Sequence, residues 1–310
     1  EKLASPEATR LVENAVKDTP AGGSVTVRAR SVLSQAYPEP KRRVSSCDER
    51  GDSSLSPRAT RRGEWLFRNF KNARGAGKSP GRSEPSSHQE SLDFYDAVEW
   101  IAKQPWCSGS IGTLGISYHA SSQWRLANLK PPALKAIMPW EGRADQYRDQ
   151  AYHGGIFALG FIGNWWLTHT AHHLLGNPRS YNPDSFHNDM MWQYMSHDLD
   201  SEYWRQSAAQ WDQITLPVYS VGNWGGFSMH LRGNTEAYMN AASKHKKLRI
   251  HTGTHFHPFH SEEGRTDQLR WFDHWLKGMD TGIMDEPPVK LEIRTGGSPE
   301  RYSFRTENEW

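Results

Sequence analysis

The sequence predicts an α/β fold with a mainly parallel sheet, and three observations indicate it. Short apolar runs typical of buried strands recur from residue 91 onward, with amphipathic stretches between them. Turns that contain glycine or proline separate the two kinds of segment. The chain has 310 residues, enough for one large domain with an insertion, or for two domains. Strands that alternate with helices favour βα units and parallel pairing.

The N-terminal segment, residues 1–63, departs from this pattern. A short capped helix is expected at 4–18, and a strand at 24–33, where apolar and polar residues alternate. Residues 38–63 are rich in Ser, Arg, Pro and Gly and contain almost no apolar residues. Such a stretch buries too little surface to offset the entropy lost on ordering, so we expect it to be irregular or disordered.

Regular elements follow in a core of two parts, 64–142 and 212–284. The strands are expected at 109–117, 133–142, 216–226 and 247–255. The helices are expected at 91–105, 121–132 and 266–280, the last with Leu269, Phe272, Trp275 and Leu276 on one side.

An insertion, residues 143–211, separates the two parts and is called the inserted segment below. It is rich in Trp, Tyr, His and Asn. Because α/β folds bind ligands beyond the carboxyl ends of their strands, an insertion between strands favours a helical cap over that edge. The alternative is a continuous core. The 14 tryptophans of the chain fit either an aromatic-lined pocket or a core of large residues.

Composition narrows the class of function. The chain has 37 Lys and Arg against 35 Asp and Glu, so its balanced charge does not indicate nucleic acid or an anionic membrane as a partner. No apolar run reaches the roughly 18 residues of a membrane span, and no signal-peptide pattern is visible, so a cytoplasmic protein is expected. Two cysteines exclude a disulfide framework.

Ser117 lies where a nucleophile elbow is expected. In such an elbow a strand ends, a tight turn exposes the serine, and a helix begins at once. Here the strand at 109–117 precedes the serine, and Gly115 stands two positions before it. The position two after it is His119 instead of the usual glycine. The pattern therefore leaves a catalytic serine and an ordinary turn serine as alternatives.

A catalytic serine needs a base, which follows later in the chain in folds of this kind. Four histidines, His251, His255, His257 and His260, come at and after the last core strand. His255 lies in the loop past the strand, where a base can reach the elbow, and His251 is expected within the strand, buried or facing away. Zinc binding by the four is the alternative, but no H-E-x-x-H or cysteine spacing accompanies them, so no metal site is predicted.

Several motifs together resemble the CocE/NonD hydrolases, a group with cocaine esterase and X-prolyl dipeptidyl-peptidases. They are "NARGAGKSPG", "QESLDFYDAVEWIAKQPWCSGSIGTLGISYHASSQW", "PPALKAIMPWEG", "DQYRDQAYHGGI", "VGNWGGFSMHLRGN" and "DQLRWFDHWLKGMDTGIMDEPPVKLEIRTGG". The resemblance covers about residues 70–310. It implies an α/β-hydrolase fold with a helical cap and a C-terminal jelly roll, whose start would be residues 285–310 unless they fold back locally.

The resemblance also implies hydrolysis of a small ester or peptide through an acyl-enzyme, without a cofactor. Ser117 matches the nucleophile, His255 the base, and the backbone N–H of Tyr118 one oxyanion donor. The oligomeric state is left open. The cap and adjoining loops would shape an apolar pocket. The candidate lining residues are Trp140, Trp165, Trp166 and Trp224, with Trp192 and Trp204 also in the cap.

Two departures from the family pattern leave alternatives open. The acid usually follows the strand at 216–226, where Gly225 stands here. Glu141 can supply the acid from the preceding strand, or it can pair with an arginine such as Arg143 or Arg148. The second oxyanion donor has only Tyr37 as a candidate. An impaired relative that keeps the hydrolase shell without turnover is therefore the alternative to an active enzyme.

Overall fold

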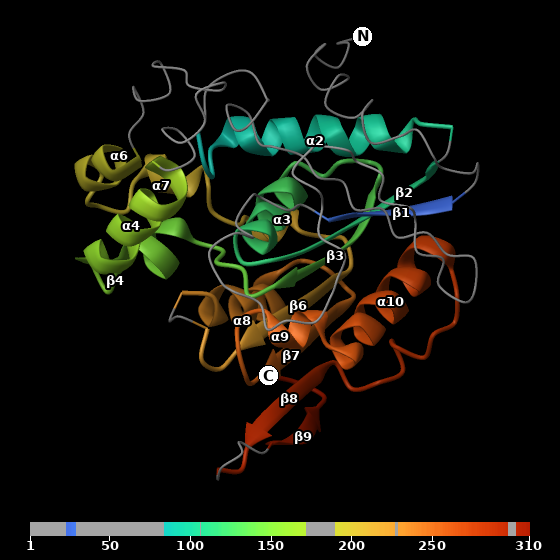
Figure 1. The fold of residues 1–310 in the computed structure, drawn as a ribbon. Coiled ribbons are helices and arrows are strands. Elements are labelled where there is room, and N and C mark those ends of the chain that lie inside the picture. Colours follow the sequence, from blue (N-terminus) through green and yellow to red (C-terminus); the bar gives the residue numbers. More distant parts are fainter. Residues whose placement is uncertain (1–22, 29–83, 106, 172–189, 227–228, 297–301) are drawn as a thin grey trace, which may run out of the picture.

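The computed structural model describes residues 23–28, 84–105, 107–171, 190–226, 229–296 and 302–310 (Figure 1). Its centre is a seven-stranded sheet in the order β1-β2-β3-β6-β7-β8-β9. The strands are β1 Gly23–Arg28, β2 Cys107–Ile116, β3 Leu134–Trp140, β6 Val218–Asn223, β7 Lys246–His251, β8 Val289–Arg294 and β9 Tyr302–Glu307. Every neighbouring pair is parallel except β8 with β9. The expected parallel α/β architecture is confirmed.

Helices cover both faces of this sheet. The larger ones are α2 His88–Ala102, α3 Tyr118–Asn128, α8 Leu231–Asn240 and α10 Glu262–Lys277, and the short α9 is His257–His260. One core cluster joins α2, α3 and α8 to Ile111, Ile137 and Val218. Another joins α9 and α10 to Leu114, Met138 and Tyr219. Alternate residues of β2, β3 and β6 thus face opposite layers, as strand geometry requires.

The apolar side of α10 differs from the expectation in one position. Phe272 is buried, and Trp275 and Leu276 pack against the same cluster, as the spacing indicates. Leu269 is 39% exposed, and Trp271 occupies the buried position instead. The buried stripe is therefore rotated toward Gln268 and Trp271, because the large indole fills the space against Tyr219.

The two ends of the described chain both extend the main sheet. β1 belongs to the N-terminal segment and pairs in parallel with β2. The expected helix at 4–18, the irregular stretch at 38–63 and Tyr37 lie outside the described residues. β8 pairs in parallel with β7 and antiparallel with β9, so residues 289–294 and 302–307 add two strands to the main sheet, and a jelly roll that starts at 285–310 stays a prediction.

Arg249 on β7 ties the C-terminal hairpin to the core. Its Nη1 is 2.8 Å from Asp267 Oδ2 on α10, and its Nη2 is 2.7 Å from Glu292 Oε1 on β8. The guanidinium is 1% exposed, so both contacts are made in a low-dielectric interior. Glu292 Oε2 also accepts hydrogen bonds from the backbone N–H and hydroxyl of Thr252. β8 thus holds the loop that follows β7.

The inserted segment forms a layer of short elements beside the start of α2 (Figure 1). They are η2 Tyr147–Ala151, β4 Tyr152–His153, β5 Ile156–Phe157, α4 Leu159–Trp165, η3 Trp166–Ala171, α6 Met190–Ser196, α7 Glu202–Arg205 and η5 Trp211–Gln213. All except η5 contribute to a core cluster around Tyr152, Tyr194 and Trp204, whereas Trp211 of η5 packs on the cluster that joins α2, α3 and α8. Across the described ranges, no helix has the length and apolarity to cross a membrane.

Candidate active site

Ser117 stands at the turn between β2 and α3, with φ 63° and ψ −119°. A non-glycine residue in this conformation is strained, and the surrounding structure has to enforce it. Ser117 N–H donates to the carbonyl of Trp140 at 2.9 Å, and the Ser117 carbonyl accepts from Ser121 N–H at 3.0 Å. The strand, turn and helix follow one another in the order that the elbow pattern predicts.

Gly115 explains how the turn accommodates His119. A Cβ placed on Gly115 would lie 2.5 Å from His119 Cβ and 3.1 Å from its carbonyl oxygen. Such a contact is closer than atoms tolerate, so only glycine fits here. The turn brings the chain before Ser117 close to the chain after it. Because Gly115 has no side chain, the residue two positions after Ser117 can be as large as His119.

Glu141 follows β3 directly and projects into the interior of the site. Its φ is 49°, and its side chain is completely buried. The residue before it, Trp140, accepts the hydrogen bond from Ser117. The candidate nucleophile and the candidate acid therefore lie at the carboxyl ends of two adjacent parallel strands, where α/β folds place their sites.

The Glu141 carboxylate contacts His255, and not an arginine. Glu141 Oε2 is 2.7 Å from His255 Nδ1, while Oε1 accepts from Asn223 Nδ2 at 3.2 Å. Arg143 instead donates to Ser86 Oγ, and Arg148 pairs with Asp145 and Asp200. Of the two alternatives left open by the sequence, the structure shows the histidine contact.

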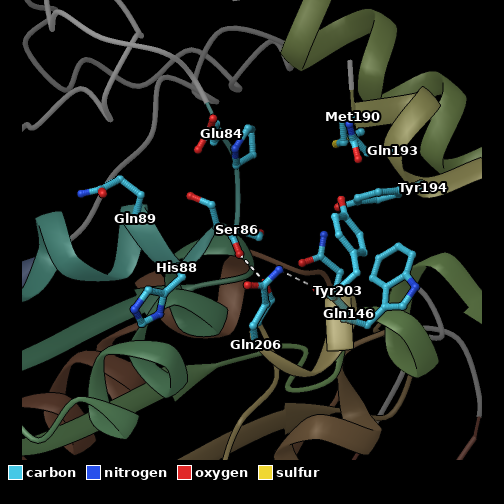
Figure 2. A pocket seen from close by; sticks show the side chains of 14 residues that line it. Glu84, Ser86, His88, Gln89, Gln146, Met190, Gln193, Tyr194, Tyr203 and Gln206 are labelled. Atoms are coloured by element: carbon cyan, nitrogen blue, oxygen red, sulfur yellow. Dashed lines mark hydrogen bonds between the residues drawn. The ribbon is translucent and has the colours of Figure 1, made fainter. Parts of the chain in front are cut away.

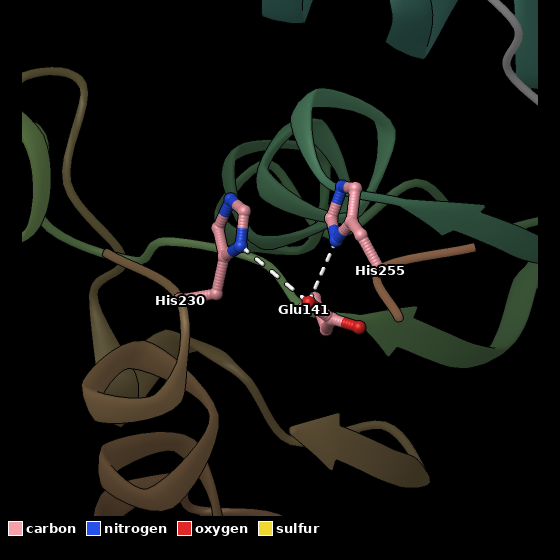
Figure 3. A group of neighbouring side chains, drawn as sticks. All are labelled: Glu141, His230 and His255. Carbon is pink, nitrogen blue, oxygen red and sulfur yellow. Dashed lines mark hydrogen bonds and ion pairs between the residues drawn. The ribbon is translucent and has the colours of Figure 1, made fainter. Parts of the chain in front are cut away.

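Two further histidines, His251 and His230, lie against the same carboxylate, and Figure 3 shows His230 beside Glu141 and His255. His251 Nε2 is 3.1 Å from Glu141 Oε1, so His251 is buried as expected but faces the carboxylate instead of turning away. His230 Nδ1 is 3.8 Å from Oε2, and its ring stacks on that of His255, with centroids 5.2 Å apart. His230 lies within the motif at 221–234 quoted above, but sequence reasoning gave it no role.

Burial and these contacts shift the pKa values of the group in definite directions. Burial alone raises the pKa of Glu141, but the attraction of the three neighbouring histidines, His230, His251 and His255, outweighs it and holds that pKa well below its ordinary value. Burial lowers the pKa of His230 to about 4. The site therefore contains an ionised carboxylate and a neutral His230 at neutral pH.

The loop after β6, where the acid is usual in the resembling family, makes room for Glu141. Gly225 occupies that position, and Gly226 follows it. A Cβ on Gly226 would lie 3.2 Å from Glu141 Oε2, which is tight. Gly226 thus leaves space for a carboxylate that enters from β3, next to the strand that carries Ser117.

Tyr118 begins α3, so its backbone N–H belongs to the helix N-terminus, where N–H groups have no intrahelical acceptor. Its hydroxyl turns away into a buried polar network. It donates to Glu90 Oε2 at 2.7 Å and accepts from Ser86 N–H at 2.8 Å, and Arg125 pairs with the same carboxylate. This network, which fixes α2 against α3, was also missed by sequence reasoning.

The tryptophans expected around a pocket have different positions. Trp165 stacks on Tyr118 at 6.3 Å between ring centroids, beside the elbow, and Trp166 packs on the core of the inserted segment. Trp224 is 39% exposed and donates to the Glu292 carbonyl. Trp140 is completely buried against Phe259, so it is a core residue instead of a pocket wall.

Trp192 and Trp204 also differ from each other. Trp192 is 67% exposed, and Trp204 lies in the core of the inserted segment.

A cavity of about 310 Å³ lies between the start of α2 and this segment, with Glu84 and Ser86 on one side and Gln193 and Tyr194 on the other (Figure 2). Ser117, Glu141 and His255 do not line it. The Tyr118 side chain links the elbow to this neighbouring cavity through Ser86.

Comparison with known proteins gives consistent results. A family model described as X-Pro dipeptidyl-peptidase (S15 family) matches residues 68–257. The cocaine esterase of a Rhodococcus species is 35% identical over 97 residues, which cover 31% of this chain and 17% of the esterase.

Two crystal structures of a CocE/NonD family hydrolase from Staphylococcus aureus are also similar. One has a TM-score of 0.72 and 33% identity, covering 79% of this chain and 43% of the other. The second has a TM-score of 0.77 and 28% identity, covering 94% and 52%. This chain therefore spans about half or less of the length of these relatives.

Proposed function

Because the chain belongs to the X-Pro dipeptidyl-peptidase (S15) family and has the α/β-hydrolase fold of its CocE/NonD relatives, we propose that it is a serine hydrolase. Its substrates are small esters or X-prolyl peptides, which it cleaves through an acyl-enzyme. Ser117 is the nucleophile, His255 the base and Glu141 the acid. The backbone N–H of Tyr118 is one oxyanion donor.

The contact between Glu141 Oε2 and His255 Nδ1, 2.7 Å long, carries this proposal. An ionised carboxylate at this distance fixes the Nδ1–H tautomer, so that Nε2 is the basic nitrogen. It also stabilises the imidazolium that forms during the reaction. A carboxylate in contact with the base supports the active enzyme over the impaired relative that keeps the hydrolase shell without turnover.

The residues act in the following sequence. His255 Nε2 takes the proton of Ser117 Oγ as the oxygen bonds to the substrate carbonyl carbon. The negative oxygen of the tetrahedral intermediate accepts a hydrogen bond from Tyr118 N–H at the start of α3. Collapse breaks the ester or amide bond, and His255 gives its proton to the leaving alcohol or amine. In the second half of the reaction, His255 takes a proton from water, which attacks the acyl carbonyl carbon. The ester bond to Ser117 breaks, Ser117 Oγ takes back a proton from His255, and the carboxylic acid product is released.

A fluorophosphonate probe tests the nucleophile directly. We expect covalent labelling of Ser117 in the folded chain, identified by peptide mass spectrometry, because the probe reacts with activated serines. The Ser117→Ala variant is the control for the site, and heat-unfolded protein is the control for activation. A folded chain that stays unlabelled, or labelling that persists in Ser117→Ala, contradicts the proposal.

A substrate panel then separates the two bond types. The name of the cocaine esterase relative refers to an ester substrate, and the description of the family model refers to X-Pro peptides. We propose an aryl acetate and an X-prolyl anilide as the test pair, because both release a chromophore. Hydrolysis of either one, lost in Ser117→Ala, supports the hydrolase assignment, and hydrolysis of neither contradicts it.

A further inference from the structure

Three potential metal-ligand atoms converge on one side of the Glu141 carboxylate. His255 Nδ1 lies 2.7 Å and His230 Nδ1 3.8 Å from Glu141 Oε2, and one potential ligand atom of each residue lies within 4.8 Å of those of the other two. Figure 3 shows both rings turned toward the carboxylate. The three residues come from separate parts of the chain, directly after β3, directly before α8 and in the loop after β7.

His230 has no part in the proposed reaction, yet its Nδ1 is aimed into this group. The side chain is 2% exposed, and Nδ1 has no hydrogen-bond partner among the described residues. Burying a polar atom without a partner costs about 1–3 kcal/mol, so such an atom calls for an explanation. A bound ion would satisfy it.

We propose that Glu141, His230 and His255 bind a divalent transition-metal ion, Zn²⁺ in particular, and that the bound ion inhibits hydrolysis. Two imidazole nitrogens and one carboxylate oxygen form a known zinc ligand set, with water in the fourth position. At zinc–ligand distances of about 2.0–2.2 Å, tetrahedral ligands lie about 3.3 Å apart. The two distances of 2.7 and 3.8 Å to Oε2 bracket this value, so small side-chain movements suffice.

The other carboxylate oxygen has the support that metal ligands require. Glu141 Oε1 accepts a hydrogen bond from Asn223 Nδ2 and lies 3.1 Å from His251 Nε2. Hydrogen bonds of this kind orient a ligating carboxylate and are part of functional metal sites. Oε2 can therefore bind the ion while Oε1 keeps its present partners.

Inhibition follows from which atoms the ion occupies. Zinc binds the lone pair of His255 Nδ1, so the single proton of the neutral ring moves from Nδ1 to Nε2. Nε2 then already carries a proton and cannot take the proton of Ser117. This consequence rests on the proposed function, whereas the binding of the ion does not.

The test measures Zn²⁺ binding and inhibition separately. Calorimetric titration with Zn²⁺ in chelator-free buffer is expected to show one ion per chain. In His230→Phe, which keeps an aromatic ring on His255, the affinity should fall at least about tenfold. His257→Gln is the matched control, because His257 is an exposed histidine at the start of α9, close to His255 in the chain but outside the cluster.

Hydrolysis is measured relative to the metal-free rate of each variant. Zn²⁺ should inhibit hydrolysis by the unmodified chain and by His257→Gln, and EDTA should restore both rates. Equal inhibition of His230→Phe should require at least about tenfold more Zn²⁺. Mg²⁺ should have no effect, since it prefers oxygen ligands. If His230→Phe fails to fold by circular dichroism, His230→Gln replaces it.

The outcomes are distinguishable. Absence of stoichiometric Zn²⁺ binding, or equal affinity in the folded His230 variant and the unmodified chain, overturns the metal site. Zinc binding in a chain that hydrolyses neither test substrate leaves the site supported and contradicts the proposed function alone. Binding that depends on His230 without loss of activity overturns the inhibitory role.

Discussion

At the scale of single residues, the elbow depends on one close contact. Gly115 and His119 meet at a distance that excludes any side chain on Gly115, and this contact sets the direction in which the turn presents Ser117. The histidine two positions after Ser117 is therefore compatible with an elbow.

Gly115→Ala is expected to damage both fold and activity. Its Cβ would overlap His119, so the turn has to shift, at a cost of about 1–3 kcal/mol in the free energy of unfolding. A displacement of about 1 Å at the nucleophile can lower kcat by about 10²-fold. Urea unfolding and aryl acetate hydrolysis measure the two effects. Gly160→Ala, in α4 with no described atom within 4 Å of the added Cβ, should cause neither.

Glu141→Gln is expected to lower kcat by on the order of 10⁴, because the amide no longer fixes the productive tautomer of His255. The KM should change little, since the carboxylate does not touch the substrate. Steady-state hydrolysis by the variant and by Glu236→Gln, a carboxylate on α8, provides the comparison. Unchanged kcat in Glu141→Gln would remove Glu141 from the catalytic group.

The Tyr118→Phe variant distinguishes the role of the Tyr118 backbone N–H from that of its hydroxyl. Loss of the hydroxyl removes its hydrogen bond to the Glu90 carboxylate and leaves Ser86 N–H with Glu90 as its one remaining acceptor, which should cost about 1–3 kcal/mol of stability. The proposed oxyanion donor is retained, so kcat should fall less than the 10²–10³-fold typical of losing such a donor. Tyr95→Phe on α2 is the control. A loss of kcat without a loss of stability would contradict this division of roles.

At the scale of elements, β8 supports both loops that approach the site. Glu292 holds Thr252 in the loop leading to His255, and its backbone carbonyl accepts from the Trp224 indole after β6. Arg249 connects this strand to α10. The C-terminal hairpin is therefore part of the structure that positions the base.

Arg249→Met is expected to destabilise the chain by about 3–5 kcal/mol, because Asp267 and Glu292 are left buried without their cation. Chemical denaturation measures the change. Replacing all three residues with apolar ones of similar volume should recover most of it. Arg305→Met, which breaks an exposed pair with Glu307, should cost less than about 1 kcal/mol. If Arg249→Met lowered the free energy of unfolding by a similarly small amount, the buried ion pairs of Arg249 would not be a major source of stability.

At the scale of the whole molecule, most strands of the central sheet and the helices that cover it could be predicted, because apolar residues recur in each at a regular spacing. α8 could not, since "LRGNTEAYMN" buries mainly Gly233, Asn234 and Ala237, which give no apolar stripe. The pairing of β8 with β7 was also missed, because partners and register depend on contacts distant in sequence. The division into domains stays a prediction.

Within the site, chain order indicated Ser117 and His255, but not which way Glu141 turns. That direction is set by its positive φ and by the space that Gly226 leaves, neither of which a residue pattern reveals. His230 was missed for a related reason. Its motif at 221–234 pointed to no catalytic histidine, and His230 joins the group only because β3, β6 and β7 are neighbours in the sheet.

Ser117 and Glu141 both have positive φ, although neither is glycine. Each such residue costs about 1–3 kcal/mol, so the native state holds conformational energy at the two positions proposed to act together. Selection for heat resistance alone would favour glycine or asparagine at both positions, and each such gain would remove a proposed catalytic group. A laboratory evolution experiment on this chain should therefore couple every round of thermal selection to a measurement of turnover.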